Sequence, residues 1–346
     1  EKILRDTEHQ AFIVKMVIVQ HAVGTEPGTD KSGVHNVVQD IFFGHVGIRG
    51  QKGKLLLGKF IFQGGEQLFF KGQDGLGVST NLICLASFII KAPMVNYVSE
   101  WVLGQDPLNR ERIQKRILFY SRFPGGSILH TVASAIVLAL WDIAGKVANL
   151  PVYKMLGAVR DKVPVYCHAY GKTYKETLEV LYPKMEKYGY KACKVLVSSL
   201  GYDRNGQAER DIAAMFEGVR NAVGDDFEIG IDMSSKIYEP IQAKRCIKAI
   251  EPYRPFFAEE PIRPENMENW AEIGIGRDVP IATGEQIFTS WDYDRLLKLH
   301  VVDILQPDIL LAGGFTGMLK IAAIVWSRVD LSNPSAYTMS GAPHIM

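Results

Sequence analysis

The sequence lacks the features that mark several classes of protein. Its 346 residues carry 39 basic and 38 acidic side chains, with no run of lysine or arginine. Because binding to nucleic acid or to an anionic membrane needs a local excess of positive charge, we expect neither as a partner. The longest uninterrupted apolar stretches fall well short of the ~20 residues that cross a bilayer. What remains is a globular protein, large enough to bury a sizeable core and to hold two domains.

Cysteine is scarce and gives no sign of a disulfide framework or a zinc site. The four cysteines are far apart, with no CxxC spacing, and we expect them to be buried thiols: Cys84, Cys167, Cys193 and Cys246. This usage suits a reducing compartment. The charged start, EKILRDTEHQ, has no signal-peptide core, so we expect a cytoplasmic protein.

The chain changes character near residue 160. Before it, extended runs such as 12–20, 36–43 and 54–63 are broken by glycine-rich connections and followed by helical patterns, which is typical of an α+β domain. We therefore predict an α+β capping domain over 1–125, a helical connection over 126–160 and a (β/α) barrel domain over 161–346. Within the connection, 127–148 is apolar nearly all round, which predicts a buried helix where the two domains join.

After residue 160, short apolar segments alternate with amphipathic stretches. Strands that are apolar throughout indicate a parallel sheet covered on both faces, and so many units in a row favour a closed barrel. The predicted strands are 163–169, 191–197, 227–232, 255–260, 279–285 and 302–308. The predicted helices are 174–188, 207–222, 240–250, 266–274, 290–300 and 316–328.

Three carboxylates stand at the ends of successive predicted strands. Asp232, Glu259 and Glu285 are separated by 27 and then 26 residues, an interval that fits one strand and one helix. They should therefore project side by side at the carboxyl rim of the sheet, where such folds place their active sites.

Each acid taken alone has an ordinary explanation, because a carboxylate at a strand end often caps the next helix or pairs with a lysine. Three such charges brought together without a cation would repel one another and raise one another's pKa. The arrangement makes physical sense mainly around a hard divalent ion. Mg²⁺ fits best, since every ligand is oxygen and no histidine or cysteine accompanies the acids.

The sequence resembles the enolase superfamily, and within it the mandelate racemase group that includes the acid-sugar dehydratases. The stretches that carry the resemblance cover most of 100–320: ALWDIAGKVANLPVYKMLGA ending at Ala158, GYKACKV at 189–195, FFAEEPIRPEN at 256–266, PIATGEQIFTSWDYDRLL at 280–297 and VDILQPDILLAGGFTG at 302–317. The resemblance implies an α/β fold, a (β/α)₇β TIM-like barrel beneath an N-terminal α+β capping domain. It also implies that Asp232, Glu259 and Glu285 are the Mg²⁺ ligands.

The resemblance suggests roles for residues around the three acids. Lys194 stands where the family commonly has a Lys-x-Lys pair, but Leu196 replaces the second lysine. This argues against a two-lysine racemase and leaves Lys194 as an electrostatic or acid–base residue, or as a solvated lysine at the rim. Glu260, the second acid of EEP, is expected to support the metal site rather than bind the ion.

The acid–base residues depart from the family pattern. Asp308 resembles the acid that orients a catalytic histidine on the next strand. Counting along the chain places that histidine at Ser335, so either an insertion makes His344 the base or His344 is only a terminal residue. Ser234 replaces a histidine that galactonate-type dehydratases carry, and serine is a poor general acid.

Two expectations concern the substrate and the extent of the chain. His168, at the end of the first barrel strand, either touches substrate together with Ser234 and Glu260 or is simply packed. The start at Glu1 and an end soon after His344 suggest a partial reading of a longer chain, truncated at the last strand.

The resemblance implies removal of a proton next to a carboxylate with the help of Mg²⁺, and dehydration of a sugar acid to a 2-keto-3-deoxy acid. A racemase or epimerase of the same superfamily, or a paralogue that binds a metal or an acid without turnover, are the alternatives. The partner would be a small carboxylate substrate, and the protein a homo-oligomer.

Overall fold

The structure is a computed structural model that describes residues 59–63, 67–71, 77–81, 85–120, 122, 125–158, 161–196, 205–328 and 338–339, with side chains from Met94 to Ser327. The predicted strands over 12–20 and 36–43 lie outside these residues, as do Ser335 and His344.

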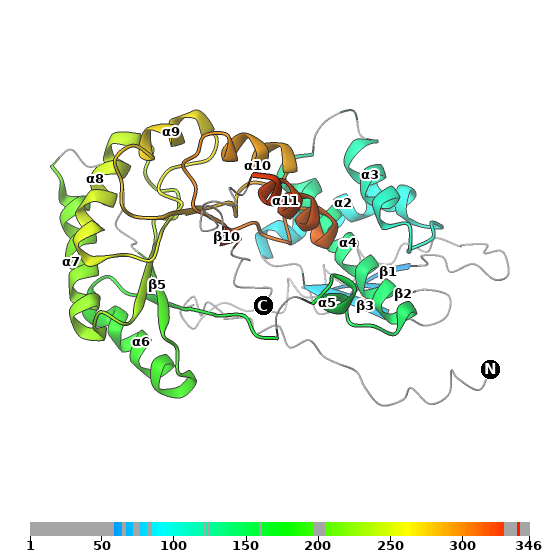
Figure 1. Cartoon of the computed structure of the whole chain (residues 1–346). Helices are drawn as coiled ribbons and strands as arrows, with labels where there is room; N and C mark the ends of the chain where they lie inside the picture. The colour runs from blue at the N-terminus through cyan, green and yellow to red at the C-terminus, as the bar shows by residue number, and fades with distance from the viewer. Residues whose placement is uncertain are drawn as a thin grey trace, which may run out of the picture.

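The first part of the described chain is a small sheet with helices (Figure 1). Three strands pair antiparallel in the order β1-β2-β3. Helices follow them, as the glycine-broken pattern predicts for an α+β cap. The strands are β1 (Lys59–Gln63), β2 (Gln67–Lys71) and β3 (Gly77–Asn81), and the helices are α2 (Leu85–Val102), α3 (Arg110–Phe119), α4 (Gly126–Ala148) and α5 (Val152–Met155).

Helix α4 is the buried helix that the sequence predicts. Its apolar residues pack with α2 and α3, and Leu129, Val132, Ile136 and Leu140 are almost completely buried. The helix ends at Asn149, which adopts the left-handed conformation that commonly terminates helices. By length and composition α4 could cross a membrane, but most of it is buried, as in the core helix of a globular domain.

The second part is a parallel sheet flanked by helices, as predicted. The strands are β4 (Cys167–Tyr170), β5 (Ala192–Leu196), β6 (Glu228–Asp232), β7 (Ala258–Glu259), β8 (Ile281–Thr283), β9 (Ile304–Leu305) and β10 (Thr338–Met339). The helices are α6 (Tyr174–Tyr188), α7 (Gln207–Val223), α8 (Pro240–Ile250), η1 (Glu251–Tyr253), η2 (Met267–Asn269), α9 (Trp270–Ile273), α10 (Ser290–Leu297) and α11 (Gly314–Arg328).

The strand order runs from β10 to β4 without reversal, so every strand lies beside its neighbour in the chain. Helices α6 to α10 form an arc along one side of these strands (Figure 1). This is the α/β architecture of a TIM-like barrel. Among the residues that the structure describes, the two end strands are not paired with each other.

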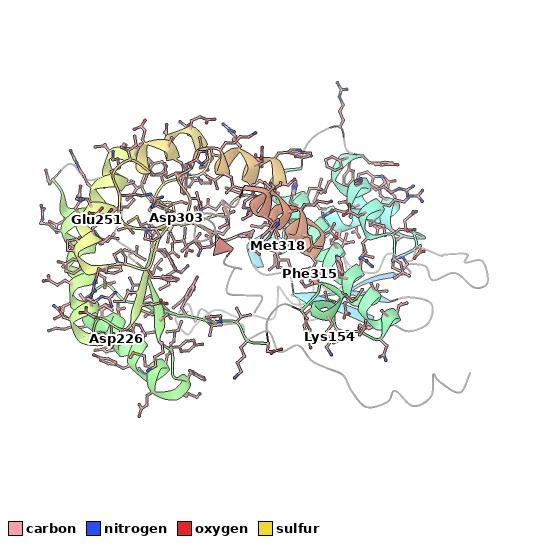
Figure 2. The ribbon with its side chains drawn as sticks, viewed as in Figure 1. Lys154, Asp226, Glu251, Asp303, Phe315 and Met318 are labelled. Atoms are coloured by element: carbon pink, nitrogen blue, oxygen red, sulfur yellow. The ribbon has the colours of Figure 1, made fainter. Side chains whose placement is uncertain are left out.

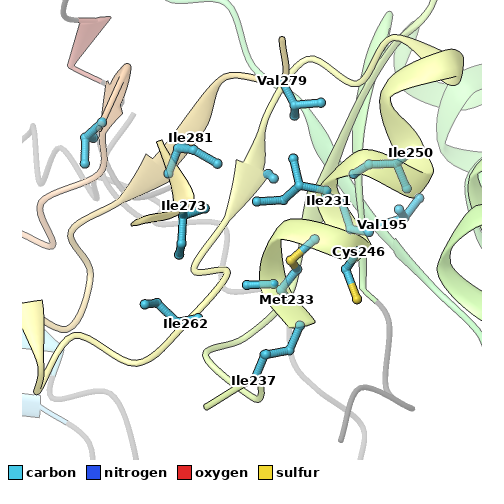
Figure 3. Close-up of a cluster of buried hydrophobic side chains, with 14 of the residues drawn as sticks. Val195, Ile231, Met233, Ile237, Cys246, Ile250, Ile262, Ile273, Val279 and Ile281 are labelled. Carbon is cyan, nitrogen blue, oxygen red and sulfur yellow. The ribbon is translucent and has the colours of Figure 1, made fainter. Parts of the chain in front are cut away.

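Alternation along the strands sends one set of side chains, which is apolar, toward the helices and the other set, which includes the polar ones, to the opposite face. Val195, Ile231 and Ile281 pack in the main core with residues of α8 and α9 (Figure 3). Lys194 and Asp232 adjoin two of these residues in the chain, and Glu259 follows Ala258 of the same core, so all three side chains face the barrel interior. Strand register places Asp232 directly beside Glu259.

The cap and the barrel meet where α4 packs beside α11. The indole nitrogen of Trp141 donates to the Thr316 hydroxyl at 2.9 Å, and the Gly313 amide donates to the Ser134 hydroxyl at 2.9 Å. Figure 2 shows Phe315 on α11, and its ring lies 6.0 Å from that of Trp141. The predicted junction is therefore a packed, hydrogen-bonded contact.

The cysteines that the structure describes are buried and free, as expected: Cys167, Cys193 and Cys246. Burial raises the pKa of the Cys193 thiol to about 12. This thiol therefore stays protonated at neutral pH and acts as a small apolar core residue. Cys84 lies outside the described residues.

Candidate active site

Lys194 is the centre of the polar group inside the barrel. It lies in the middle of β5, its side chain is buried, and its ammonium contacts two acids. Nζ is 2.6 Å from Oε1 of Glu259 and 3.0 Å from Oδ2 of Asp232. Strand pairing explains the arrangement, because β5, β6 and β7 are consecutive in the sheet.

Electrostatics keep this lysine charged. Burial alone would lower the pKa of Lys194, but Glu259 and then Asp232 outweigh it and raise the pKa above its ordinary value. Burial in turn raises the pKa of Glu259 to about 7, against the lowering effect of Lys194. The site therefore holds the buried Lys194 ammonium between two carboxylates, and burial opposes ionisation of one of them, Glu259.

Glu285, the third predicted ligand, follows β8 and has a different setting. Its side chain is exposed to solvent on one side. Loss of hydration to the surrounding protein, and then repulsion by the Glu260 carboxylate, raise its pKa to about 7. Lys194, Asp232 and Asp308 also act on it, so it belongs to the same charged neighbourhood. Gly284 makes the turn before it, with φ of 141° and the backbone of Gln306 about 3.1 Å from where a side chain would begin.

The three acids do not converge on a single point. Among the residues that the structure describes, no three histidine, cysteine or acidic side chains lie close enough together to hold a metal ion. The ammonium of Lys194 occupies the space between Asp232 and Glu259 instead. The ordinary explanation of a carboxylate paired with a lysine therefore describes two of the acids in this arrangement.

The donor set nevertheless fits a hard divalent cation. Asp232 and Glu259 end β6 and β7, and Glu285 follows the adjacent strand β8. Asp232 and Glu259 already pair with the positive charge of Lys194. Burial raises the pKa of Glu259 and of Glu285, and nearby carboxylates add to the effect, so a bound cation would favour the ionised form of both. These three residues are the ones that would hold Mg²⁺.

Gln306 is a site residue that sequence reasoning missed. Its amide Nε2 donates to Oε2 of Glu259 at 2.9 Å, so Glu259 is held by a lysine on one oxygen and by an amide on the other. Its Oε1 is also buried, and the side chain lies beside the Tyr166 hydroxyl. A polar side chain directly after the apolar strand β9, in the QPD motif, is the signal that could have identified it.

Tyr166, also missed, lies on the same interior face beside the predicted residue His168. The two rings stack at 6.0 Å, and His168 is level with Lys194 in the strand register. The Tyr166 hydroxyl is buried close to the Gln306 side chain. Burial and then the Glu259 charge raise the pKa of this phenol to about 12. His168 thus lies within the polar interior, at a position that suits either contact with substrate or packing.

Ser234 and Asp308 make local turns. The amide and hydroxyl of Ser234 donate to Oδ1 of Asp232 at 2.8 and 3.1 Å, which leaves Oδ2 for the lysine. Asp308 accepts a hydrogen bond from the Leu310 amide at 2.8 Å in the turn before α11. The histidine that Asp308 is predicted to orient, His344, lies outside the described residues.

Glu260 is fully buried and accepts hydrogen bonds from its surroundings, among them the hydroxyls of Ser235 and Thr283, each at 2.5 Å. This position fits the supporting role expected for it more closely than contact with substrate. Burial raises its pKa, and the hydrogen bonds oppose that effect.

Comparison with known proteins matches both parts of the chain. Residues 71–157 match the mandelate racemase / muconate lactonizing enzyme N-terminal domain, and residues 178–328 match the enolase C-terminal domain-like family. A D-galactonate dehydratase of Ralstonia pickettii (strain 12J) is 34% identical over 252 residues, which is 72% of this chain. The chain spans 63% of the length of that relative.

Solved structures agree on the fold. An enolase from Agrobacterium radiobacter, bound to Na and L-malate, is 28% identical with a TM-score of 0.71, covering 83% of this chain and 72% of the other. The 3,6-anhydro-D-galactonate cycloisomerase from Zobellia galactanivorans is 25% identical with a TM-score of 0.68, covering 80% of this chain and 73% of the other. The chain belongs to the enolase superfamily, in its mandelate racemase group.

Proposed function

We propose that the protein is a Mg²⁺-dependent hydro-lyase that dehydrates a sugar acid to a 2-keto-3-deoxy acid. The observation that carries the proposal is a buried pair of carboxylates at the carboxyl ends of β6 and β7. Asp232 and Glu259 there bind the positively charged ammonium of Lys194. The D-galactonate dehydratase relative supports an aldonate substrate, and the neighbour bound to L-malate supports a site for a small carboxylate.

The reaction removes a proton from the carbon next to the substrate carboxylate and expels the hydroxyl group on the following carbon as water. The resulting enol then becomes the ketone. The bound ion would supply positive charge that stabilises the substrate carboxylate and the negative charge that develops when the proton leaves.

Lys194 contributes positive charge to this chemistry. In this structure its acidic neighbours keep it protonated. As a cation, Lys194 is suited to face developing negative charge rather than to accept a proton. The base is then assigned to His344 with Asp308 as its orienting acid, as the family resemblance implies. Gln306 and Ser234 each hold a carboxylate oxygen in place and thereby fix where Glu259 and Asp232 point.

A direct test incubates the protein with a set of sugar acids and Mg²⁺ in D₂O. Formation of a keto acid is the expected result. Exchange of the α-proton without loss of water would instead indicate an epimerase, and metal binding without either reaction would indicate a binding paralogue. Glu259→Gln should abolish turnover, whereas Glu179→Gln, an exposed glutamate on α6, should leave it unchanged. Turnover that survives in Glu259→Gln would overturn the proposed site.

A further inference from the structure

A second buried carboxylate lies directly beside the candidate metal ligands. Glu260 follows Glu259 at the end of β7, is completely buried, and has a positive φ of 48°. Left-handed backbone is unfavourable for a residue with a side chain. The Glu260 side chain contacts the Thr283 hydroxyl at the end of the neighbouring strand, β8.

Both oxygens of Glu260 are fully used by donors. Oε1 accepts from the Thr283 hydroxyl at 2.5 Å and from the Gly284 amide at 3.2 Å. Oε2 accepts from the Ser235 hydroxyl at 2.5 Å and from the Gln286 amide at 3.0 Å. Four donors directed at one side chain match the acceptor capacity of an ionised carboxylate.

These donors come from the turns that carry the other two predicted ligands. Ser235 lies three residues after Asp232, and Gly284 and Gln286 flank Glu285 on either side. Glu260 itself is the next residue after Glu259. The Glu260 carboxylate therefore connects the ends of β6, β7 and β8. These are the three strands whose acids would bind the ion together.

Backbone contacts reinforce the link between these turns. The Ser235 amide donates to the Glu260 carbonyl at 2.9 Å, and the Glu260 amide donates to the Ala282 carbonyl at 3.0 Å. Ser234 and Ser235 are themselves left-handed, with φ of 51° and 54°. Strained turns of this kind persist only where the surrounding contacts hold them.

The geometry points to Glu260 as a positioning residue, whose four hydrogen bonds set the spacing of Asp232, Glu259 and Glu285 and so the affinity of the divalent ion. The inference rests on the proposed metal site. It excludes Glu260 as a fourth ligand, because both of its oxygens already accept hydrogen bonds from protein donors.

The test is a titration of Mg²⁺ by calorimetry, repeated with Mn²⁺ by electron paramagnetic resonance, so that the readout does not depend on turnover. Glu260→Gln replaces one acceptor oxygen with an amide that faces the donors of Ser235 and Gln286. Loss of such a supporting contact should weaken ion binding at least about tenfold. Thr283→Val removes a single donor and should weaken binding less.

A paired exchange separates hydrogen bonding from simple loss of stability. In the double variant Glu260→Gln with Gln286→Glu, the amide and the carboxylate change places. The amide now at position 260 can donate to the carboxylate now at position 286, while Thr283 and Gly284 keep their acceptor. The total charge is unchanged. We expect the double variant to bind the ion more tightly than either single variant.

The outcomes separate the two proposals. Failure of the unmodified protein to bind either ion would overturn the metal site itself. Binding by the unmodified protein, with unchanged affinity in folded Glu260→Gln, would overturn the positioning role alone. If Glu260→Gln does not fold, the same comparison rests on Thr283→Val, and unchanged affinity there would count against the inference. Glu272→Gln, an exposed glutamate on α9, is the control and should bind as the unmodified protein does.

Discussion

The lysine between two acids determines how this site can receive a metal ion. Lys194 already neutralises Asp232 and Glu259, so an incoming ion must compete with its ammonium for the same oxygens. Removing the Lys194 charge should therefore have opposite effects on two quantities, the affinity for the ion and the rate of turnover.

Replacing Lys194 with methionine should therefore raise the affinity for Mg²⁺ about tenfold, because a competing positive charge is removed. Turnover should fall at least about 100-fold, because the charge that faces the developing negative charge is lost. Calorimetric titration and initial rates measure the two effects. Lys191→Met, at an exposed lysine just before β5, should change neither. Weaker ion binding in Lys194→Met would show that the lysine helps to build the site instead.

The raised pKa of Glu285 predicts how stability changes with pH in the absence of metal. Because its pKa of about 7 in the folded protein lies above its ordinary value of 4.5, its contribution to stability is complete below about pH 4.5 and is lost as the pH rises through about 7. Glu285→Gln should remove this part of the pH dependence. Urea unfolding in the presence of a chelator, between about pH 5 and pH 8, measures it.

Mg²⁺ provides the internal check for that experiment. Added in excess, it should stabilise the unmodified protein most at the upper end of the pH range, where Glu285 is ionised. Glu285→Gln should gain much less from the ion. An equal gain in both proteins would remove Glu285 from the proposed ligands.

Among the elements, the connection from α7 to β6 depends on one arginine. Arg220 is buried near the end of α7, and its guanidinium donates to the carbonyls of Gly224, Phe227, Tyr253 and Arg254. It thereby ties the loop before β6 to η1 and helps to place the strand that ends in Asp232.

Arg220→Lys should lower the free energy of unfolding by about 2–3 kcal/mol, since an ammonium cannot reach four carbonyls that a planar guanidinium spans. Urea denaturation measures the change. Arg245→Lys, at an exposed position on α8, should stay within about 0.5 kcal/mol of the unmodified protein. A comparable value for both variants would mean that the four hydrogen bonds contribute little.

How far the sequence predicts the elements depends on how each is built. Periodicity predicts α8 at its observed bounds, Pro240–Ile250, because an apolar face and an N-terminal proline define it. The strands are located but shorter than predicted, and the pattern for 255–260 yields only Ala258–Glu259 as β7. Apolar runs report burial, and burial continues past the last strand hydrogen bond.

The sequence likewise predicts some features of the site and not others. Spacing along the chain predicts that Asp232 and Glu259 are neighbours, and the register confirms it. The ion pair with Lys194 and the hydrogen bonds to Glu260 depend on side-chain directions in strained turns, which no periodic pattern encodes. The ligand set stays a prediction, as do the domain boundaries, the cytoplasmic location and the oligomeric state.

In the molecule as a whole, the cap is attached to the barrel through a close contact at the start of α11. Gly314 has φ of 62°, and a side chain there would lie 2.9 Å from Val137 of α4. Glycine is therefore required both for the backbone conformation and for the approach of the two helices.

Gly314→Ala should lower the free energy of unfolding by about 2–4 kcal/mol, combining the backbone cost with overpacking against α4. Gly276→Ala is a matched control, because Gly276 has φ of 70° with open space around it, and should cost only about 1–2 kcal/mol. Urea denaturation compares the two. Equal losses would show that the contact between cap and barrel is loose.

The proposed function depends on one claim, that Asp232, Glu259 and Glu285 together hold a divalent ion. Diffraction from crystals grown with Mn²⁺, recorded at its absorption edge, locates the ion directly. We predict one anomalous peak within about 2.0–2.3 Å of an oxygen of each of the three carboxylates, with the Lys194 ammonium displaced from between Asp232 and Glu259. A peak elsewhere, or a fully loaded protein in which Lys194 still bridges the two acids, would contradict the account.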